Sequence, residues 1–157
     1  MLKIPRNASV TISLILAVIF FFAVIAGMFT APKLVQLMID TPDNFGNRGA
    51  ISNFGRCYVL AAVYAILVII AAADIMMFKI LDNVRRGTVF TDGTVALIRC
   101  VSWCCIAVGV LFFSTGLYFQ LAIIAGFAAV FGGFCIRVVK NVIEEATAIK
   151  NENELTV

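Results

Sequence analysis

Two ionisable residues border long uncharged segments of this chain. Asp74 follows the uncharged stretch 58–73, and Arg99 stands just before the uncharged stretch 101–136. A charge inside a membrane costs a few kcal/mol unless it is paired or wetted, so an intramembrane carboxylate is a functional candidate by default. Counted from a reversal near Thr88, Asp74 lies about fourteen residues back and Arg99 about eleven forward, at similar depth on neighbouring antiparallel helices. We therefore predict an ion pair between Asp74 and Arg99. A proton or cation site, or a side chain that snorkels to the surface, are the alternatives.

The chain offers little else for catalysis. It contains no His, which removes the commonest general base and the commonest metal ligand. Its five cysteines lack the paired C-x-x-C spacing of a zinc site and are interpreted as apolar packing residues, with a disulfide or redox role left open. We therefore predict no catalytic residue, no cofactor and no metal site, and a protein that is not an enzyme. The net charge of +3 without a basic run also argues against direct binding of nucleic acid.

The elements that position these residues are membrane helices. The hydrophobic fraction is 62%, only 13% of residues are charged, and the mean hydropathy is +1.06, values far outside the range of soluble domains. The segment 101–136 would reach about 54 Å as one helix, nearly twice a hydrocarbon core of about 30 Å. It must fold back on itself, and Ser114-Thr115-Gly116 is the credible reversal. The expected fold is all-α, an integral membrane four-helix bundle in a single domain, 1–157.

Breakers and caps set the expected element bounds. Pro32 is expected to end the first helix, Arg85-Arg86-Gly87 the second, and Thr91 to cap the third. The fourth helix is expected to start near Leu117 and to leave the membrane as an amphipathic helix, followed by an irregular polar tail from Asn151. The predicted spans are about 9–31, 51–80, 92–113 and 117–137, with a cytoplasmic helix and tail over 138–157.

The distribution of Lys and Arg predicts the orientation. With both termini inside, nine basic residues lie on the inner side and only Lys33, Arg48 and Arg56 lie outside. We therefore expect both termini in the cytoplasm.

Two cytoplasmic segments carry a family resemblance. The stretch Leu81 to Thr91, with its Gly87, Phe90 and Thr91 turn, and the tail Glu152-Asn153-Glu154-Leu155-Thr156 resemble the bacterial membrane family catalogued as domain of unknown function 2975. The chain departs from that pattern at Gly93-Thr94, where an Asn is expected. The resemblance implies four spans, a location in the bacterial inner membrane and a cytoplasmic partner, for which a small helix-turn-helix regulator is one candidate.

The leading hypothesis is therefore a non-enzymatic binding or regulatory protein that engages a cytoplasmic protein from the bilayer. The alternatives are a small transporter or channel-like homo-oligomer using Asp74 and Arg99, and a structural subunit of a membrane complex. The predicted partner surface comprises Arg85, Arg86, Phe90, Thr91, Val142, Ile143, Glu144, Glu145, Glu152, Asn153, Glu154 and Leu155.

Overall fold

A computed structural model of the chain describes residues 6–41 and 52–155. Those residues form only helices and their connections, as the composition predicts. The helices are α1 (Arg6–Asp40), α3 (Asn53–Arg85), α4 (Asp92–Thr115) and α5 (Gln120–Leu155).

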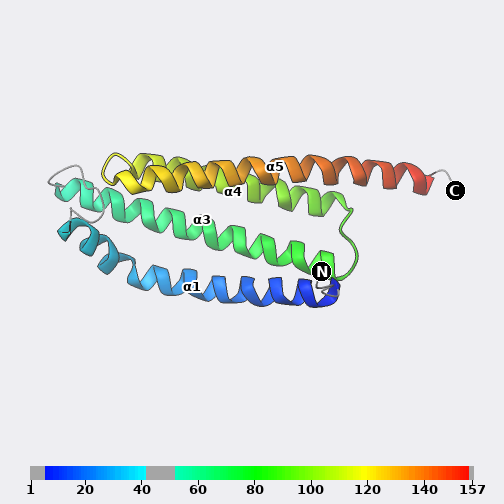
Figure 1. Cartoon of the computed structure of the whole chain (residues 1–157), viewed down its shortest axis with the longest axis horizontal. Helices are drawn as coiled ribbons and strands as arrows, with labels where there is room; N and C mark the ends of the chain where they lie inside the picture. The colour runs from blue at the N-terminus through cyan, green and yellow to red at the C-terminus, as the bar shows by residue number, and fades with distance from the viewer. Residues whose placement is uncertain (1–5, 42–51, 156–157) are drawn as a thin grey trace, which may run out of the picture.

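The helices run antiparallel to one another in chain order (Figure 1). α4 and α5 form the most extensive contact, and α3 packs against α1 on one side and α4 on the other. The start of α1, the turn between α3 and α4, and the end of α5 all lie at the same end of the bundle, where α5 extends past its neighbours. We call this the extended end, and residues 138–155 of α5 the extension.

All four helices are long and apolar enough to cross a membrane. The uncharged segments are matched in length on three of them, 57–73 in α3, 100–115 in α4 and 120–136 in α5. Each spans about 25 Å at 1.5 Å per residue, close to a hydrocarbon core. The predicted multi-pass membrane bundle is therefore confirmed.

The α4–α5 hairpin is held together by very close backbone approach. A Cβ added to Gly109 would lie 2.4 Å from Val130 Cγ2 and 3.0 Å from the carbonyl oxygen of Gly126, so any side chain there would force its neighbours to move. One heptad further along, the buried hydroxyl of Ser102 donates a hydrogen bond to the carbonyl oxygen of Gly133 (2.9 Å). Small residues that let membrane helices approach explain this contact. The hairpin reverses over 116–119, and α5 begins at Gln120, three residues later than predicted.

The prediction that Pro32 ends the first helix is wrong, because α1 continues through Pro32 to Asp40. Proline lacks the N–H that would bond to the carbonyl of the residue four positions earlier, Met28. In the structure the hydroxyl of Tyr64 on α3 donates to that carbonyl (3.3 Å). A neighbouring helix thus satisfies the freed acceptor, as membrane helices with internal proline require. Figure 1 shows α1 bent before its last turns.

The prediction of an irregular tail is also wrong, since α5 remains helical to Leu155. The sequence from Glu144 to Leu155 contains neither Gly nor Pro, so nothing local stops the helix. The extension is therefore one rod continuous with the membrane helix.

Candidate functional site at the extended end

The turn between α3 and α4 is fixed by a small polar network. The Thr91 side chain caps α4 by accepting from the backbone N–H of Thr94 (3.3 Å), as the sequence predicts. Thr94 is fully buried. Its hydroxyl forms a hydrogen bond with the Thr91 hydroxyl (2.9 Å) and accepts one from Asn83 Nδ2 on α3 (3.0 Å). Gly87 has a φ of 76°, which a residue with a Cβ adopts only at a cost. Thr94, one of the two positions at which the sequence departs from the family pattern, thus holds α3 to α4.

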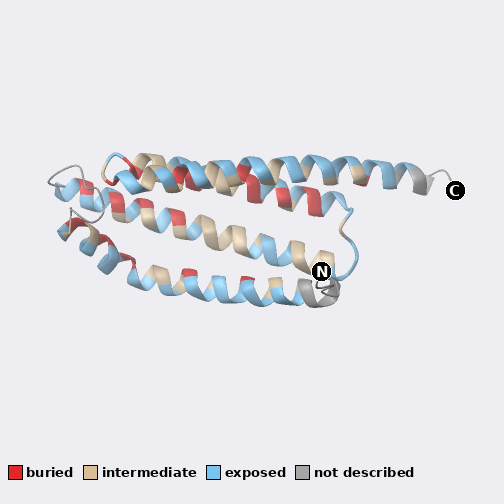
Figure 2. Cartoon of the chain, in the orientation of Figure 1, coloured by how far each residue is buried: buried red, intermediate tan, exposed pale blue. Residues whose placement is uncertain are grey.

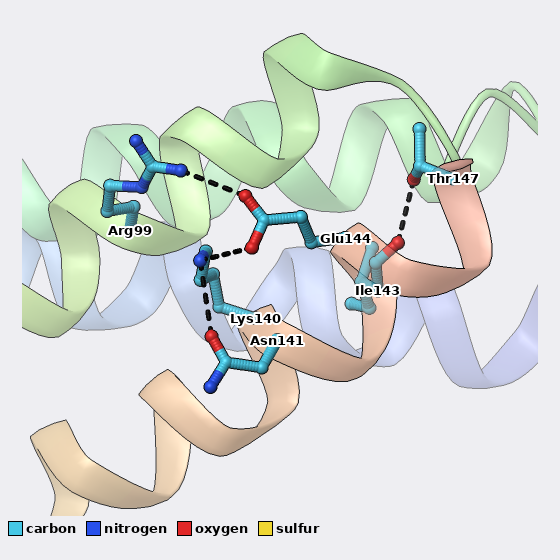
Figure 3. A network of polar contacts seen from close by, with 6 residues as sticks. All are labelled: Arg99, Lys140, Asn141, Ile143, Glu144 and Thr147. Atoms are coloured by element: carbon cyan, nitrogen blue, oxygen red, sulfur yellow. Dashed lines mark hydrogen bonds and ion pairs between the residues drawn. The ribbon is translucent and has the colours of Figure 1, made fainter. Parts of the chain in front are cut away.

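Three charged side chains join α4 to the extension (Figure 3). Arg99 on α4 donates to Glu144 Oε1 on α5 (3.1 Å), and Lys140 pairs with the other oxygen of the same carboxylate. Lys140 also reaches the side chain of Asn141 (3.2 Å). The hydrogen bond from Lys140, together with the nearby positive charge of Lys140 and Arg99, holds the pKa of Glu144 below its ordinary value. This cluster ties the base of the extension to α4.

The predicted ion pair between Asp74 and Arg99 is therefore wrong. Asn83 and Thr94 touch across the two helices, so they set the register. Asp74 lies nine residues before Asn83 and matches position 103, four residues beyond Arg99 and about 6 Å deeper. Counting from Thr88 gives nearly the same offset, three residues, so the error lay in treating that offset as equal depth. The partner of Arg99 is Glu144. The sequence spacing indicates the pairing of Glu144 with Lys140, four residues earlier, but it does not show that α4 and α5 bring Arg99 to the same carboxylate.

Asp74 itself lies where α3 borders two cavities. One, the inner cavity, has a volume of about 320 Å³ and is lined by residues from all four helices. The other lies between α1 and α3 and has a volume of about 260 Å³. Among the described residues, Asp74 forms no ion pair and no hydrogen bond to another side chain. Nor do three Cys, Asp or Glu side chains gather there, or elsewhere in the described chain, as a metal site would need.

The extension presents an apolar strip away from α4. Lys140 and Thr147 face α4, with the Lys140 side chain 13% exposed and Thr147 2% exposed. At 100° per residue the opposite side of α5 carries Val138, Val142 and Ile149, which are 64%, 62% and 55% exposed, and the exposed Glu145 lies between Val142 and Ile149 on the same side. Figure 2 shows most of the described part of the extension in the colour of exposed residues. We call these three residues the apolar strip.

The remaining residues of the predicted partner surface divide into three groups. Arg85, Arg86 and Phe90 are exposed around the turn, and Arg86 pairs with Asp82 one helical turn earlier (2.9 Å). On the extension Glu145 and Glu152 are exposed, whereas Ile143 is half-buried and its carbonyl accepts from the Thr147 hydroxyl (2.7 Å). The side chains of Asn153, Glu154 and Leu155 lie outside the described residues.

Sequence reasoning missed three residues that build this end. Thr94 and Asn83 hold the turn, and Lys140 shares the carboxylate of Glu144. The spacing of Thr91 and Thr94 is that of a helix cap and its first-turn partner, a signal that was available. The contact of Asn83 with Thr94 had no such signal, because it depends on the pairing of two helices.

These features define a class of protein, a multi-pass helical membrane protein whose last helix continues beyond the bundle. Within that class, the family model for a protein of unknown function (DUF2975) matches residues 2–157. The chain belongs to this family, as the turn and tail motifs indicated. No curated protein and no solved structure matches the chain.

Proposed function

We propose that this protein is a non-enzymatic binding or regulatory module of the bacterial inner membrane that docks a cytoplasmic protein on the extension. The observation that carries the proposal is the apolar strip. Val138, Val142 and Ile149 are each more than half exposed on a segment that also bears Lys140, Glu144 and Glu145. Charges at this density keep the segment out of the hydrocarbon. Most of the strip therefore lies beyond the hydrocarbon, where a protein groove that takes an amphipathic helix would cover it.

The rigidity of the extension supports the same reading. The extension is continuous with a membrane helix and tied to α4 through Arg99 and Glu144. A partner would meet a helix that is already formed, so binding would cost less conformational entropy than ordering a disordered tail. A helix-turn-helix regulator is one candidate for the partner, and holding it at the membrane would be the regulatory act.

The orientation belongs to the proposal as well. The extended end gathers Lys79, Arg85, Arg86, Arg99, Arg137 and Lys140, and we place this end in the cytoplasm by the positive-inside tendency. Single cysteines at positions 46 and 153, in a chain whose native cysteines are replaced by alanine, provide the test. An impermeant thiol reagent added to intact cells should label position 46 only, and labelling of position 153 would overturn the orientation.

Affinity capture in a mild detergent tests the docking. Val142→Glu places a carboxylate on the apolar strip, and Asn141→Glu places the same group one residue away on an exposed polar position. We expect a cytoplasmic protein to be recovered with the wild type and with Asn141→Glu but lost with Val142→Glu. That protein, once purified, should bind the wild type with at least tenfold higher affinity than Val142→Glu. Equal affinities for the two variants would rule out docking on the strip.

The sequence alternative of transport through a joint Asp74 and Arg99 site has no geometric support, because Arg99 bonds to Glu144 and Asp74 lies about four residues deeper. Asp74 is better considered alone, with the cavities that it lines.

A further inference from the structure

Asp74 is a carboxylate without a counterion in an apolar setting. It follows the uncharged segment 57–73 of α3 and lies on the membrane side of Arg99. Arg99 is engaged by Glu144, and no Lys or Arg lies within ion-pair distance of Asp74 among the described residues. At this edge of the apolar segment a charge without a counterion still costs free energy unless something compensates it. A cationic group that enters from outside the chain would supply that compensation.

The inner cavity gives such a group room for an apolar body. It has a volume of about 320 Å³, at the lower end of the range for small-molecule sites. Among the described residues on its lining Asp74 is the only charged one, and the others are apolar residues or cysteines, among them Phe20, Val101, Cys104 and Ile136. An apolar wall with one carboxylate selects for a molecule with one positive charge and a hydrophobic surface.

The second cavity differs in charge. Between α1 and α3, Asp74 shares the lining with Lys79. The positive charge of Lys79 would oppose a second cation there. The inner cavity is therefore the one in which charge and shape agree.

We propose that Asp74 and the inner cavity form a binding site for a lipophilic organic cation, an amine or quaternary ammonium compound with an aromatic or aliphatic body. The carboxylate pairs with the cationic nitrogen, and the walls from the four helices cover the body. This site is separate from the apolar strip and does not depend on the docking of a cytoplasmic protein.

Ethidium, a fluorescent aromatic cation, is a suitable probe for the full-length protein in lipid nanodiscs. Fluorescence anisotropy is measured against empty nanodiscs, which report partition into lipid. Asp74→Asn removes the charge and keeps the shape, while Asp82→Asn makes the same change eight residues further along α3, outside both cavities. We expect saturable binding by the wild type, at least a tenfold loss of affinity in Asp74→Asn, and an unchanged affinity in Asp82→Asn.

A second pair of variants tests the cavity itself without changing charge. Ala129→Phe fills the inner cavity, and Ala17→Phe fills the cavity between α1 and α3. We expect Ala129→Phe to abolish saturable binding and Ala17→Phe to retain it. Three results would overturn the proposal. The first is equal ethidium binding by the wild type and Asp74→Asn, and the second is binding by the wild type no greater than to empty nanodiscs. The third is a loss of binding only in Ala17→Phe. Val142→Glu should bind ethidium like the wild type, so a failure of docking and a failure of cation binding are distinct results.

Discussion

The two hairpins of this protein are packed in different ways. In α4 and α5, Gly109, Gly126 and Gly133 bring the backbones into contact, and the hydrogen bond from Ser102 crosses between the helices. In α1 and α3 the corresponding glycine, Gly27, would place a Cβ 3.5 Å from Leu67, an ordinary van der Waals distance. Both cavities lined by Asp74 border α1.

The difference assigns different tasks to the two halves. A hairpin with interlocked backbones resists deformation, because close-packed contacts transmit strain and leave no volume to rearrange. The α4–α5 hairpin is therefore the scaffold that carries the extension out of the bundle. Away from that contact the helices leave space beside an intramembrane carboxylate, since the inner cavity is lined mainly by α3 and α4, with Phe20 of α1 and two residues of α5.

The largest effect is expected from Gly109→Ala. The added Cβ would lie 2.4 Å from Val130 Cγ2 and 3.0 Å from a backbone oxygen, so the helices must separate. We expect a loss of about 2 kcal/mol in the free energy of unfolding in detergent, within the range of overpacked cores. Gly132→Ala is the matched control, since nothing lies within 4 Å of its Cβ and the change should be neutral or slightly stabilising. Equal losses in both variants would refute the close packing of the hairpin.

Ser102→Ala should have the next largest effect. It removes the buried hydrogen bond to the carbonyl oxygen of Gly133 (2.9 Å). Such bonds between membrane helices contribute about 1 kcal/mol. Ser114→Ala provides the comparison, because its hydroxyl bonds to the carbonyl oxygen of Leu111 in its own helix (2.7 Å). Thermal unfolding followed by circular dichroism should separate the two variants, and the interpretation fails if Ser114→Ala is the more destabilised.

The looser hairpin is tested by Tyr64→Phe, which removes the hydroxyl that bonds to the Met28 carbonyl. We expect a loss of about 0.5–1 kcal/mol. Pro32→Ala restores the backbone N–H that normally occupies this carbonyl. In a Pro32→Ala background the effect of Tyr64→Phe should therefore disappear, and a double-mutant cycle measures this coupling. Additive effects would show that the hydroxyl does not compensate for the proline.

The smallest effect on stability is expected from Arg99→Gln, since both partners of the pair with Glu144 are about half exposed. The effect should shrink as salt is added. Because the folded state lowers the pKa of Glu144, the stabilisation is complete above the ordinary carboxyl pKa and is lost as pH falls through the lowered value. Unfolding of the wild type and Arg99→Gln, compared at neutral and acidic pH, should converge in acid. A difference that persists in acid would contradict the assigned pair.

Much of the fold could be predicted from the sequence because its determinants are local. The length of the uncharged segments predicted the membrane spans. The Arg85-Arg86-Gly87 run predicted the end of α3, and Thr91 predicted the N-cap of α4. The errors came where a distant residue decided the outcome. Pro32 predicted the end of α1, but the helix continues because the Tyr64 hydroxyl donates to the carbonyl that the proline leaves unpaired.

The candidate site shows the same division. The apolar positions of the extension followed from helical spacing, and the structure leaves Val142 exposed. The partner of Arg99 did not follow, because a shift of a few residues in helix register changes which charges meet.

The sequence by itself determined that this chain crosses a membrane four times and that its last helix carries charges beyond the last span, since both follow from hydropathy along the chain. Only the tertiary structure decided that Arg99 meets Glu144, that Asp74 is left beside a cavity, and that Val138, Val142 and Ile149 face away from α4. The physical reason is that hydrocarbon selects residues by type, one segment at a time, whereas ion pairs and cavities depend on the register between helices, which close contacts such as Gly109 with Gly126 set.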